Sequence, residues 1–478
     1  MAVALMIGFY LFALLVAGTL LYVPYAAVAY LGTINLLTIF SAIGGLVILW
    51  SIIPHPDTFE APGPELRPHD HPRLFELIGE VAAATEQEMP AEVYLVYDFN
   101  AWVTNRGGVM GFGSRRVMGL GLPLLNVLSI PELKGVLAHE FGHYHYGDTR
   151  LGPWVYKTRN AIERTLKNLA SHNSNLYKLF RWYGLMFLRV SHSVSRQQEF
   201  TADALATRVV GPELVTAALK KSHAHTPAFY TYWNNEVTPA LASGYRPPIA
   251  AGFKLFAASP RVAAALDEYL RIGLQRSEPS DPYDTHPTLS ERLSALEGGQ
   301  AVETDLKKGT TSALTLLDDV EQLEASLIAM LVIPDLARRI QPLKWEEMGE
   351  KVWIEEWKRT IEMHRDELRT MPVEALPASA AELEQAVSTL GVTSDVRLPP
   401  DERAQATLVV LGAALGATLA REGWSYVATP GDPHIFEYRA QRIDPFDTVT
   451  RLARQELPRE EWTALCAATG LSGARLAQ

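Results

Sequence analysis

Two long apolar runs dominate the beginning of the chain. No Asp, Glu, Lys, Arg or His occurs before His55, and the first formally charged residue is Asp57. The runs at residues 3–23 and 35–53 are each long enough, as a helix, to span about 30 Å, which is the thickness of the hydrocarbon core of a bilayer. The pattern predicts a transmembrane helical hairpin over residues 1–54, so the N-terminus and the rest of the chain would face the same side.

Residues 24–34 separate the two runs and contain Pro24, Gly32 and two tyrosines. Proline and glycine predict a break here, and interfacial tyrosines fit one membrane surface as Trp50 fits the other. A cleaved signal peptide would need a positively charged start and a shorter apolar core. A hairpin buried inside a soluble domain is the other alternative, and the length of the charge-free runs favours the membrane.

Beyond the hairpin, a proline-rich linker over residues 55–69 leads into a region of mixed periodicity. Asp70 is predicted to be the N-cap of a helix whose apolar face comprises Leu74, Leu77, Ile78 and Val81. Residues 93–96 predict a buried strand, and the glycine-rich residues 101–122 predict strand, turn, strand. Residues 129–147 predict a helix with a capping box formed by Ser129 and Glu132.

The second half of the chain predicts further helices and a separate end. Residues 150–210 are helical in pattern, without another convincing membrane span. The apolar run 406–420 is only about 15 residues long, so we interpret it as a buried helix. The predicted domains are a hairpin, a linker, a catalytic domain, a helical connecting region and a small C-terminal domain, at residues 1–54, 55–69, 70–300, 301–403 and 404–478.

Composition and charge restrict the function classes. The chain has 478 residues, enough for two or three domains, and a formal net charge of -11, so it lacks the basic footprint of a nucleic-acid-binding protein. Its single cysteine, Cys466, excludes an internal disulfide framework and is interpreted as a small buried residue in a helix.

The strongest chemical signal is His139-Glu140-Phe141-Gly142-His143 inside the capped helix. Positions i and i+4 lie on one helical face, so both imidazoles can reach one Zn²⁺ ion, and Glu140 can accept the proton of the hydrolytic water. An ordinary amphipathic helix with surface histidines is the alternative. The apolar neighbours Val136, Leu137 and Phe141 predict a buried helix, which favours the metal site.

A catalytic zinc site needs a third protein ligand and an open fourth position. Glu199 and Asp203 share one helical face in the segment 195–203, between apolar positions. We expect Glu199 to bind the metal and Asp203 to support a ligand by accepting a hydrogen bond from an imidazole N–H. A solvated acidic face is the alternative for this pair.

Together, GVLAHEFGHYHYGD at residues 135–148 and SRQQEFTADALA at residues 195–206 resemble the HtpX-like membrane zinc metallopeptidases, relatives of the CAAX prenyl proteases. The resemblance covers roughly residues 70–296. It extends to Asn100-Ala101 before the glycine-rich segment, and to Thr285-His286-Pro287 with Arg292. HtpX carries two more membrane spans between the two motifs, and this chain has no comparable apolar runs there.

The resemblance implies an α+β fold. A transmembrane helical hairpin would precede a mainly helical gluzincin-type metallopeptidase domain with a small β-sheet, and a C-terminal accessory α/β region would follow. It also implies one Zn²⁺ per chain and cleavage of protein or peptide substrates in membrane-protein quality control. The protein would be a multi-pass protein of the bacterial inner membrane, in contact with the lipid bilayer, with its catalytic domain in the cytoplasm.

Four further residues receive candidate roles. Asp148 either orients a ligand or ends the helix, and His286 either donates a hydrogen bond to the developing oxyanion or forms a structural turn. Asn100 and Ala101 begin the edge strand along which a substrate would lie extended. A catalytically silent, zinc-stabilised membrane scaffold or adaptor that acts through its C-terminal domain is the alternative function, and the intact Glu140 argues against it.

Overall fold

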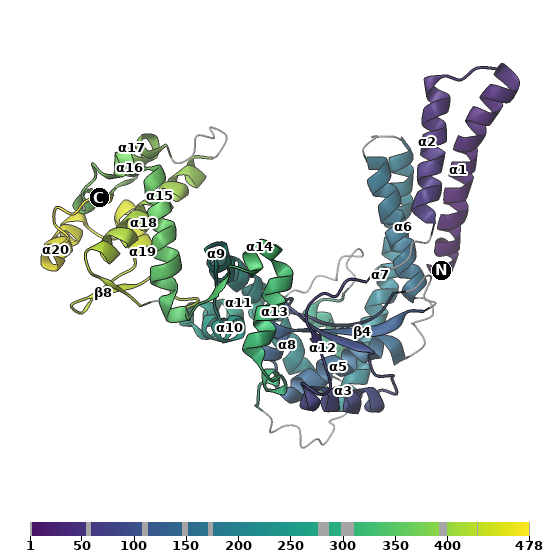
Figure 1. Cartoon of the computed structure of the whole chain (residues 1–478), viewed down its shortest axis with the longest axis horizontal. Coiled ribbons are helices and arrows are strands. Elements are labelled where there is room, and N and C mark those ends of the chain that lie inside the picture. The colour runs from purple at the N-terminus through teal and green to yellow at the C-terminus, as the bar shows by residue number, and fades with distance from the viewer. Residues whose placement is uncertain are drawn as a thin grey trace. The chain divides into compact units, whose positions relative to one another are not determined.

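The computed structural model describes residues 2–53, 59–107, 113–145, 152–170, 175–275, 286–297, 310–391, 399–427 and 429–477. These residues are mainly helical, with small sheets (Figure 1). The chain divides into two compact units, and each unit is built from two segments. Unit 1 comprises Met1–Thr226 and Glu268–Leu327, and unit 2 comprises Pro227–Asp267 and Ile328–Gln478.

The first two helices are α1 (Ala2–Leu31) and α2 (Leu36–Ile52), which pack side by side as a hairpin. The predicted break at Pro24 is wrong, because Pro24 lies inside α1. Proline removes one backbone donor, a loss that long apolar helices tolerate. The turn instead begins at Gly32, whose φ of 61° suits glycine, and Asn35 with Thr38 forms a capping box at the start of α2.

By length and composition, two helices in the described residues pass as candidate membrane spans: Ala4–Leu31 and Pro400–Arg421. A third is added if the bent pair α10 and α11 counts as one span. The shorter α2 is apolar throughout. The most apolar window of α1 is 22% buried, and that of Pro400–Arg421 is 67% buried. The predicted buried helix at residues 406–420 is therefore confirmed as part of a protein core.

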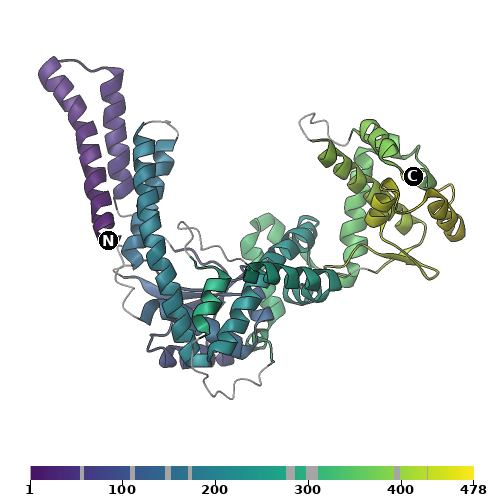
Figure 2. The same cartoon turned by 180° about the vertical axis from the view of Figure 1, so that it is seen from behind.

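A second helical hairpin packs against the first. It consists of α6 (Gly152–Ala170) and α7 (Asn175–Val210), and Figures 1 and 2 both show it beside α1 and α2. The shared core contains Phe9 of α1, Ile48 of α2, Ile162 of α6 and Phe180 of α7. The long helix α7 then continues into the part of unit 1 that contains the sheet.

The sheet of unit 1 has four strands in the order β1-β2-β4-β3. The strands are β1 (Glu65–Leu66), β2 (Glu92–Val96), β3 (Ala101–Arg106) and β4 (Arg115–Gly121). β2 runs parallel to β4, β3 runs antiparallel to β4, and β3 therefore lies at an edge. The predicted strand at 93–96 and the predicted strand pair within 101–122 are confirmed.

The helices around this sheet are α3 (Pro72–Ala84), α4 (Leu122–Val127), α5 (Ile130–His145), α8 (Pro212–Tyr232) and α12 (Leu289–Leu296). In α3 the predicted buried face is confirmed. Its predicted N-cap, Asp70, is wrong: the N-cap is His71, without a side-chain capping bond, because Pro72 occupies the first helical position.

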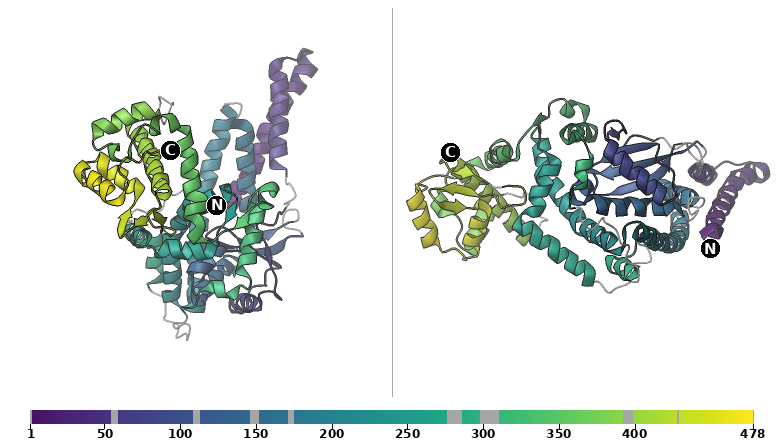
Figure 3. Two further views of the ribbon diagram at one scale, coloured as in Figure 1. Left: turned by 60° about the vertical axis from the view of Figure 1, so that its left-hand side comes forward. Right: turned by 90° about the horizontal axis from the view of Figure 1, so that it is seen from below.

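Unit 2 has its own core, in which α18 (Pro400–Arg421) packs against α15 (Ile354–Met363) and α19 (Pro445–Ala453). Three short antiparallel strands follow α18: β7 (Ser425–Tyr426), β8 (Phe436–Tyr438) and β9 (Gln441–Ile443). The last 80 residues, green to yellow in Figure 3, thus combine helices with a small sheet. Cys466 of α20 (Arg459–Thr469) is fully buried in this core, as predicted.

The remaining elements complete the two units. They are η2 (Trp233–Val237), α9 (Thr238–Ala242), β5 (Tyr245–Arg246), α10 (Ile249–Ala258), α11 (Pro260–Gln275), η4 (Ala313–Leu316), α13 (Val320–Leu331), α14 (Pro334–Ala337), β6 (Gln341–Pro342), η5 (Trp345–Glu347), η6 (Gly349–Trp353), α16 (Arg365–Leu368), η7 (Val373–Ala375) and α17 (Ala380–Leu390).

Candidate metal centre

The helix α5 carries the first motif, and a capping box fixes where it begins. The backbone N–H of Ser129 donates to Glu132 Oε2 at 2.8 Å, and the N–H of Glu132 donates to Ser129 Oγ at 3.5 Å. The predicted cap is confirmed. Lys221 Nζ also lies 2.7 Å from the buried Glu132 carboxylate, which ties the start of α5 to α8.

Glycine inside the first motif brings α5 close to α7. A Cβ atom at Gly142 would lie 2.8 Å from Cα of Ala202 and 3.1 Å from its Cβ, closer than side chains pack. Because Ala202 lies between Glu199 and Asp203 on α7, this close approach places the second motif directly against the first. The identity of the fourth motif residue therefore sets the distance between the two halves of the site.

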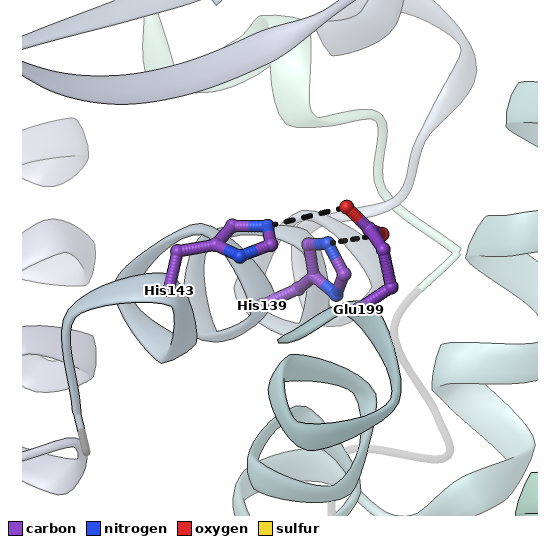
Figure 4. A group of neighbouring side chains, drawn as sticks. All are labelled: His139, His143 and Glu199. Atoms are coloured by element: carbon purple, nitrogen blue, oxygen red, sulfur yellow. Dashed lines mark ion pairs between the residues drawn. The ribbon is translucent and has the colours of Figure 1, made fainter. Parts of the chain in front are cut away.

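Three side chains converge at this crossing. His139 Nε2 lies 3.4 Å from Glu199 Oε2, and His143 Nε2 lies 3.7 Å from Glu199 Oε1. Figure 4 shows both rings, presented by one face of α5, next to the Glu199 carboxylate. One ligand atom from each residue lies within 4.8 Å of the others, which is the arrangement of a three-residue metal site.

Asp203 and Arg292 make the next layer of contacts around His139 and Glu199. Asp203 Oδ1 lies 2.9 Å from His139 Nδ1, while Arg292 of α12 donates to both oxygens of the same carboxylate, at 2.8 and 2.5 Å. Arg292 Nη1 also lies 3.5 Å from Glu199 Oε2. When the Asp203 carboxylate accepts a hydrogen bond from the Nδ1–H group of His139, the Nε2 atom of His139 keeps its lone pair. That lone pair is then available to a metal ion held with Glu199 and His143.

The pKa values of Asp203, Glu199 and His143 all lie below their ordinary values. Burial alone would raise the pKa of Asp203, but hydrogen bonds from Arg292 and His139 outweigh it and hold that pKa at about 2. The pKa of Glu199 is likewise held at about 2, against burial, by His139 and Arg292. Burial lowers the pKa of His143 to about 4, with His139 adding to the effect.

Glu140 lies between the two histidines and contacts the edge strand. Burial raises the pKa of its carboxyl to about 7, although a backbone hydrogen bond from Val103 acts in the other direction. The hydroxyl of Tyr144 donates to the Val103 carbonyl at 2.9 Å. Glu140 and Tyr144, which are one turn apart on α5, therefore both bind β3 at Val103. Glu140 is the carboxyl group that would transfer the proton.

The remaining candidate residues have different positions. His286 Nε2 lies 3.5 Å from Glu199 Oε1, and the His286 side chain is 68% exposed. Ala101 is the buried first residue of β3, and the carbonyl of the exposed Asn100 accepts the Gly121 N–H at 2.8 Å. Asp148 lies outside the described residues.

Three contributors were not among the predicted site residues: Gly142, Tyr144 and Arg292. Gly142 gave a sequence signal, because glycine in a buried helix implies a close approach. Arg292 could be noticed only through the resemblance of its segment, since nothing in its spacing indicates Asp203. Tyr144 has no signal in the sequence, because its partner is a backbone carbonyl of a strand about 40 residues away.

The donor set fits zinc. Two imidazole nitrogens and one carboxylate are the ligands of catalytic zinc sites, and three protein ligands leave a fourth position for a reacting group. Asp203 supplies the ligand-orienting hydrogen bond that metal-binding histidines usually make. His139, His143 and Glu199 would hold the ion.

Residues 68–300 match the sequence profile of peptidase family M48. A protein named Protease HtpX homolog from Tropheryma whipplei (strain TW08/27) is 29% identical over 173 residues, which cover 32% of this chain and 57% of that protein. A Protease HtpX homolog from Campylobacter concisus (strain 13826) is 23% identical over 253 residues, 49% of this chain and 76% of that protein.

A third relative, Protease HtpX homolog 1 from Saccharolobus solfataricus, is 32% identical over 126 residues, which cover 25% of this chain and 37% of that protein. The chain thus spans little more than half the length of the Tropheryma relative. No solved structure matches this chain.

Proposed function

We propose, from the match of residues 68–300 to peptidase family M48, that the chain is a membrane-anchored, zinc-dependent endopeptidase that cleaves peptide bonds of protein substrates. The observation that carries the proposal is the convergence of His139, His143 and Glu199 within 4.8 Å, with Glu140 on the same helix. A structural metal site has no use for the additional carboxyl group. The presence of Glu140 therefore favours a working hydrolase over a silent scaffold.

His139, His143 and Glu199 would hold a zinc ion, which when bound would supply polarisation of the scissile carbonyl group and of the attacking water molecule. Glu140 accepts the proton of that water and passes it to the leaving amine. Burial raises the pKa of the Glu140 carboxyl, which makes it a stronger base than an exposed carboxylate. His286, beside Glu199, is proposed to donate a hydrogen bond to the oxyanion as it develops.

The substrate would bind as an additional strand along β3. An edge strand offers backbone donors and acceptors to an extended peptide, so binding depends little on side chains. β3 lies at the sheet edge. At Val103 its carbonyl and N–H are bound by Tyr144 and Glu140, so the substrate would pair with the residues of β3 on either side of Val103. We propose that Asn100 and Ala101 form the start of this substrate edge, and that Asp148 orients a ligand.

Membrane anchoring is assigned to α1 and α2. Both are apolar throughout, and α1 exposes large apolar side chains such as Leu11 and Leu15 at 63% and 69% of their area. Side chains of this kind are stable in lipid and costly in water. The catalytic domain would lie on the cytoplasmic side of a bacterial inner membrane, and substrates would include membrane proteins under quality control.

The test separates metal binding from proton transfer. Glu140→Gln keeps the size of the side chain and removes the proton acceptor, so zinc stays bound while peptide cleavage falls by about 10² to 10⁴-fold. Glu199→Gln replaces a ligand by a weak one, so zinc and cleavage are lost together. Glu76→Gln, at an exposed position of α3, is the matched control and changes neither.

Zinc stoichiometry and peptide cleavage are measured on the same purified batches. Full activity of Glu140→Gln would refute the peptidase mechanism. Full zinc content in Glu199→Gln would refute the third ligand and leave the mechanism standing with a different carboxylate. Zinc retained in the wild-type protein without any cleavage of unfolded protein substrates would favour the scaffold instead.

A further inference from the structure

The hairpin formed by α6 and α7 has a charge opposite to that of the rest of the chain. Residues 152–190 contain seven Lys or Arg residues and one acidic residue, Glu163, which gives this stretch a net charge of +6 in a chain whose net charge is -11. The basic residues are Lys157, Arg159, Arg164, Lys167, Lys178, Arg181 and Arg189. A concentration of positive charge of this kind attracts an anionic surface.

Contacts with α2 fix the position of the hairpin α6–α7 along the axis of α2. Arg164 donates to the Ser51 carbonyl at 3.1 and 3.3 Å, and Asn168 donates to Ser51 Oγ at 2.9 Å. Ser51 belongs to the last turn of α2, next to Trp50, which is 65% exposed. The end of α6 therefore lies at the level at which α2 leaves the membrane, where tryptophan is typically found at the interface.

Contacts with α1 leave one face of α7 uncovered. Tyr183 donates from its hydroxyl to the Leu5 carbonyl at 2.6 Å, and its ring stacks on Phe12 with a centroid distance of 5.5 Å. On another side of the helix, Leu179, Trp182 and Leu185 expose 41%, 61% and 37% of their area. Their spacing of three residues keeps them along one face of α7.

Basic side chains flank this apolar face. Lys178 and Arg181 are exposed and adjoin Leu179 and Trp182 in sequence, and Lys167 near the end of α6 is 75% exposed. An apolar stripe that includes tryptophan, bordered by lysine and arginine, is the composition of helices that lie in the headgroup region of anionic membranes.

We propose that the hairpin α6–α7 is an interfacial lipid-binding element, which inserts Leu179, Trp182 and Leu185 into the headgroup region and binds anionic lipid headgroups through Lys167, Lys178 and Arg181. The partner is the leaflet of the bilayer that α1 and α2 cross, on the side of the catalytic domain. The inference rests on the proposed membrane anchoring of α1 and α2. It does not depend on the peptidase activity.

Two observations select this occupant. Both hairpins share one core, so the uncovered face of α7 belongs to the same packed body as the proposed membrane hairpin α1–α2. The charge of the stretch is complementary to acidic lipids, while the remainder of this chain is acidic. A soluble polyanion is the competing ligand, and the test below includes it.

The experiment uses the full chain in lipid vesicles, with a fluorophore attached to Trp182→Cys in a Cys466→Ala background. In vesicles that contain about one third phosphatidylglycerol, a nitroxide on the lipid headgroup should quench this fluorophore by at least half. Met89→Cys, at a position 41% exposed in the same unit, is the matched control and should stay unquenched. Leu15→Cys on α1 should be quenched by a nitroxide deep in the acyl chains.

A charge variant, K167E/K178E/R181E, should reduce the quenching at position 182 at least twofold in anionic vesicles, whereas Lys254→Glu outside the hairpin should not change it. Equal quenching of both variants would refute the headgroup contacts. An unquenched position 182 beside a quenched position 15 would refute the proposal and leave the membrane anchor intact. An unquenched fluorophore at position 15 would refute the insertion of α1 into the membrane.

The same labelled protein in detergent is titrated with polyglutamate or tRNA. No change in emission is expected below the micromolar range at physiological salt. A response to either polymer stronger than the response to anionic vesicles would assign the basic face to a macromolecular polyanion and overturn the lipid assignment.

Discussion

Oδ1 of Asp203 lies 2.9 Å from Nδ1 of His139, and Arg292 holds the same carboxylate from the other side with two hydrogen bonds. Asp203 is 2% exposed, so its charge is compensated almost entirely by these two partners. The pair thus links α12, near the end of the M48 region, to His139 on α5, the first of the proposed metal ligands. Under this proposal both residues act through His139 and are positioning residues.

Removing the charge of Asp203 should weaken the metal site without abolishing it. Asp203→Asn retains the size of the side chain and can still accept a hydrogen bond, but it orients the His139 ring less strongly. We expect zinc affinity to fall by about 10 to 100-fold, measured by competition with a chelator. Asp267→Asn, at an exposed position, is the control. Unchanged affinity in Asp203→Asn would contradict the supporting role.

Removing Arg292 should affect stability more than metal affinity. Arg292→Met leaves the buried Asp203 carboxylate without its strongest partner, so the free energy of unfolding should fall by about 3 to 5 kcal/mol. Urea denaturation followed by circular dichroism gives this value. Arg271→Met breaks an exposed ion pair with Glu268 and should leave the transition where it is. Equal effects of the two substitutions would mean that Asp203 is solvated.

A methyl group at Gly142 should separate the two motifs. Glycine to alanine in a helix normally stabilises by up to about 1 kcal/mol. At Gly142 the sign should reverse, because the new Cβ would meet the backbone of Ala202 at 2.8 Å. Gly142→Ala should lower both the melting temperature and the zinc content. Gly79→Ala on α3, whose nearest neighbour would be Met89 Sδ at 3.9 Å, should stabilise instead.

In unit 2, two partly buried groups should give opposite pH dependences of stability. Burial raises the pKa of Glu236 to about 7, although its carboxylate accepts the Gly431 N–H. The folded state then binds a proton that the unfolded state loses above about pH 4.5, so stability falls as the pH rises from about 4.5 to 7. Burial lowers the pKa of His434 to about 4, so stability rises from about pH 4 to 6.5.

Because the two slopes overlap, the wild-type stability of this segment should be nearly flat between pH 5 and 6.5. Glu236→Gln should make it rise by about 2 kcal/mol over that interval, and His434→Phe should make it fall by about the same amount. Amide hydrogen exchange of residues 429–438 measures the change. Parallel slopes in the two variants would show that neither group keeps its shifted pKa.

Reporter fusions at Pro64 and after Gln478 should report the same side of the membrane, and that side should be the cytoplasm. The hairpin α1–α2 returns the chain to its starting side, and α18 is enclosed in the core of unit 2 rather than exposed to lipid. Opposite orientations of the two fusions would identify α18 as a span.

The features that depend on neighbouring residues in the sequence were predicted correctly. The capping box at Ser129, the buried face of α3 and the pairing of the two histidines depend on residues within one or two turns, and the structure has all three. The errors at Pro24 and Asp70 arose where a neighbouring constraint outweighed a propensity: a continuous apolar helix in one case and Pro72 in the other. Arg292 and Tyr144 depend on distant chain segments, which spacing alone does not indicate.

Because α7 is one continuous helix, the proposed membrane contact at Trp182 would set how far Glu199 lies from the bilayer. The helix runs without interruption through both Trp182 and Glu199, and their separation of 17 positions corresponds to about 25 Å along the axis. A polypeptide leaving the bilayer at the level of Trp182 needs about eight extended residues to reach the metal ligand. Membrane proteins whose loops lie close to the bilayer would not be cleaved, whereas a released tail or an unfolded segment of that length could be cleaved.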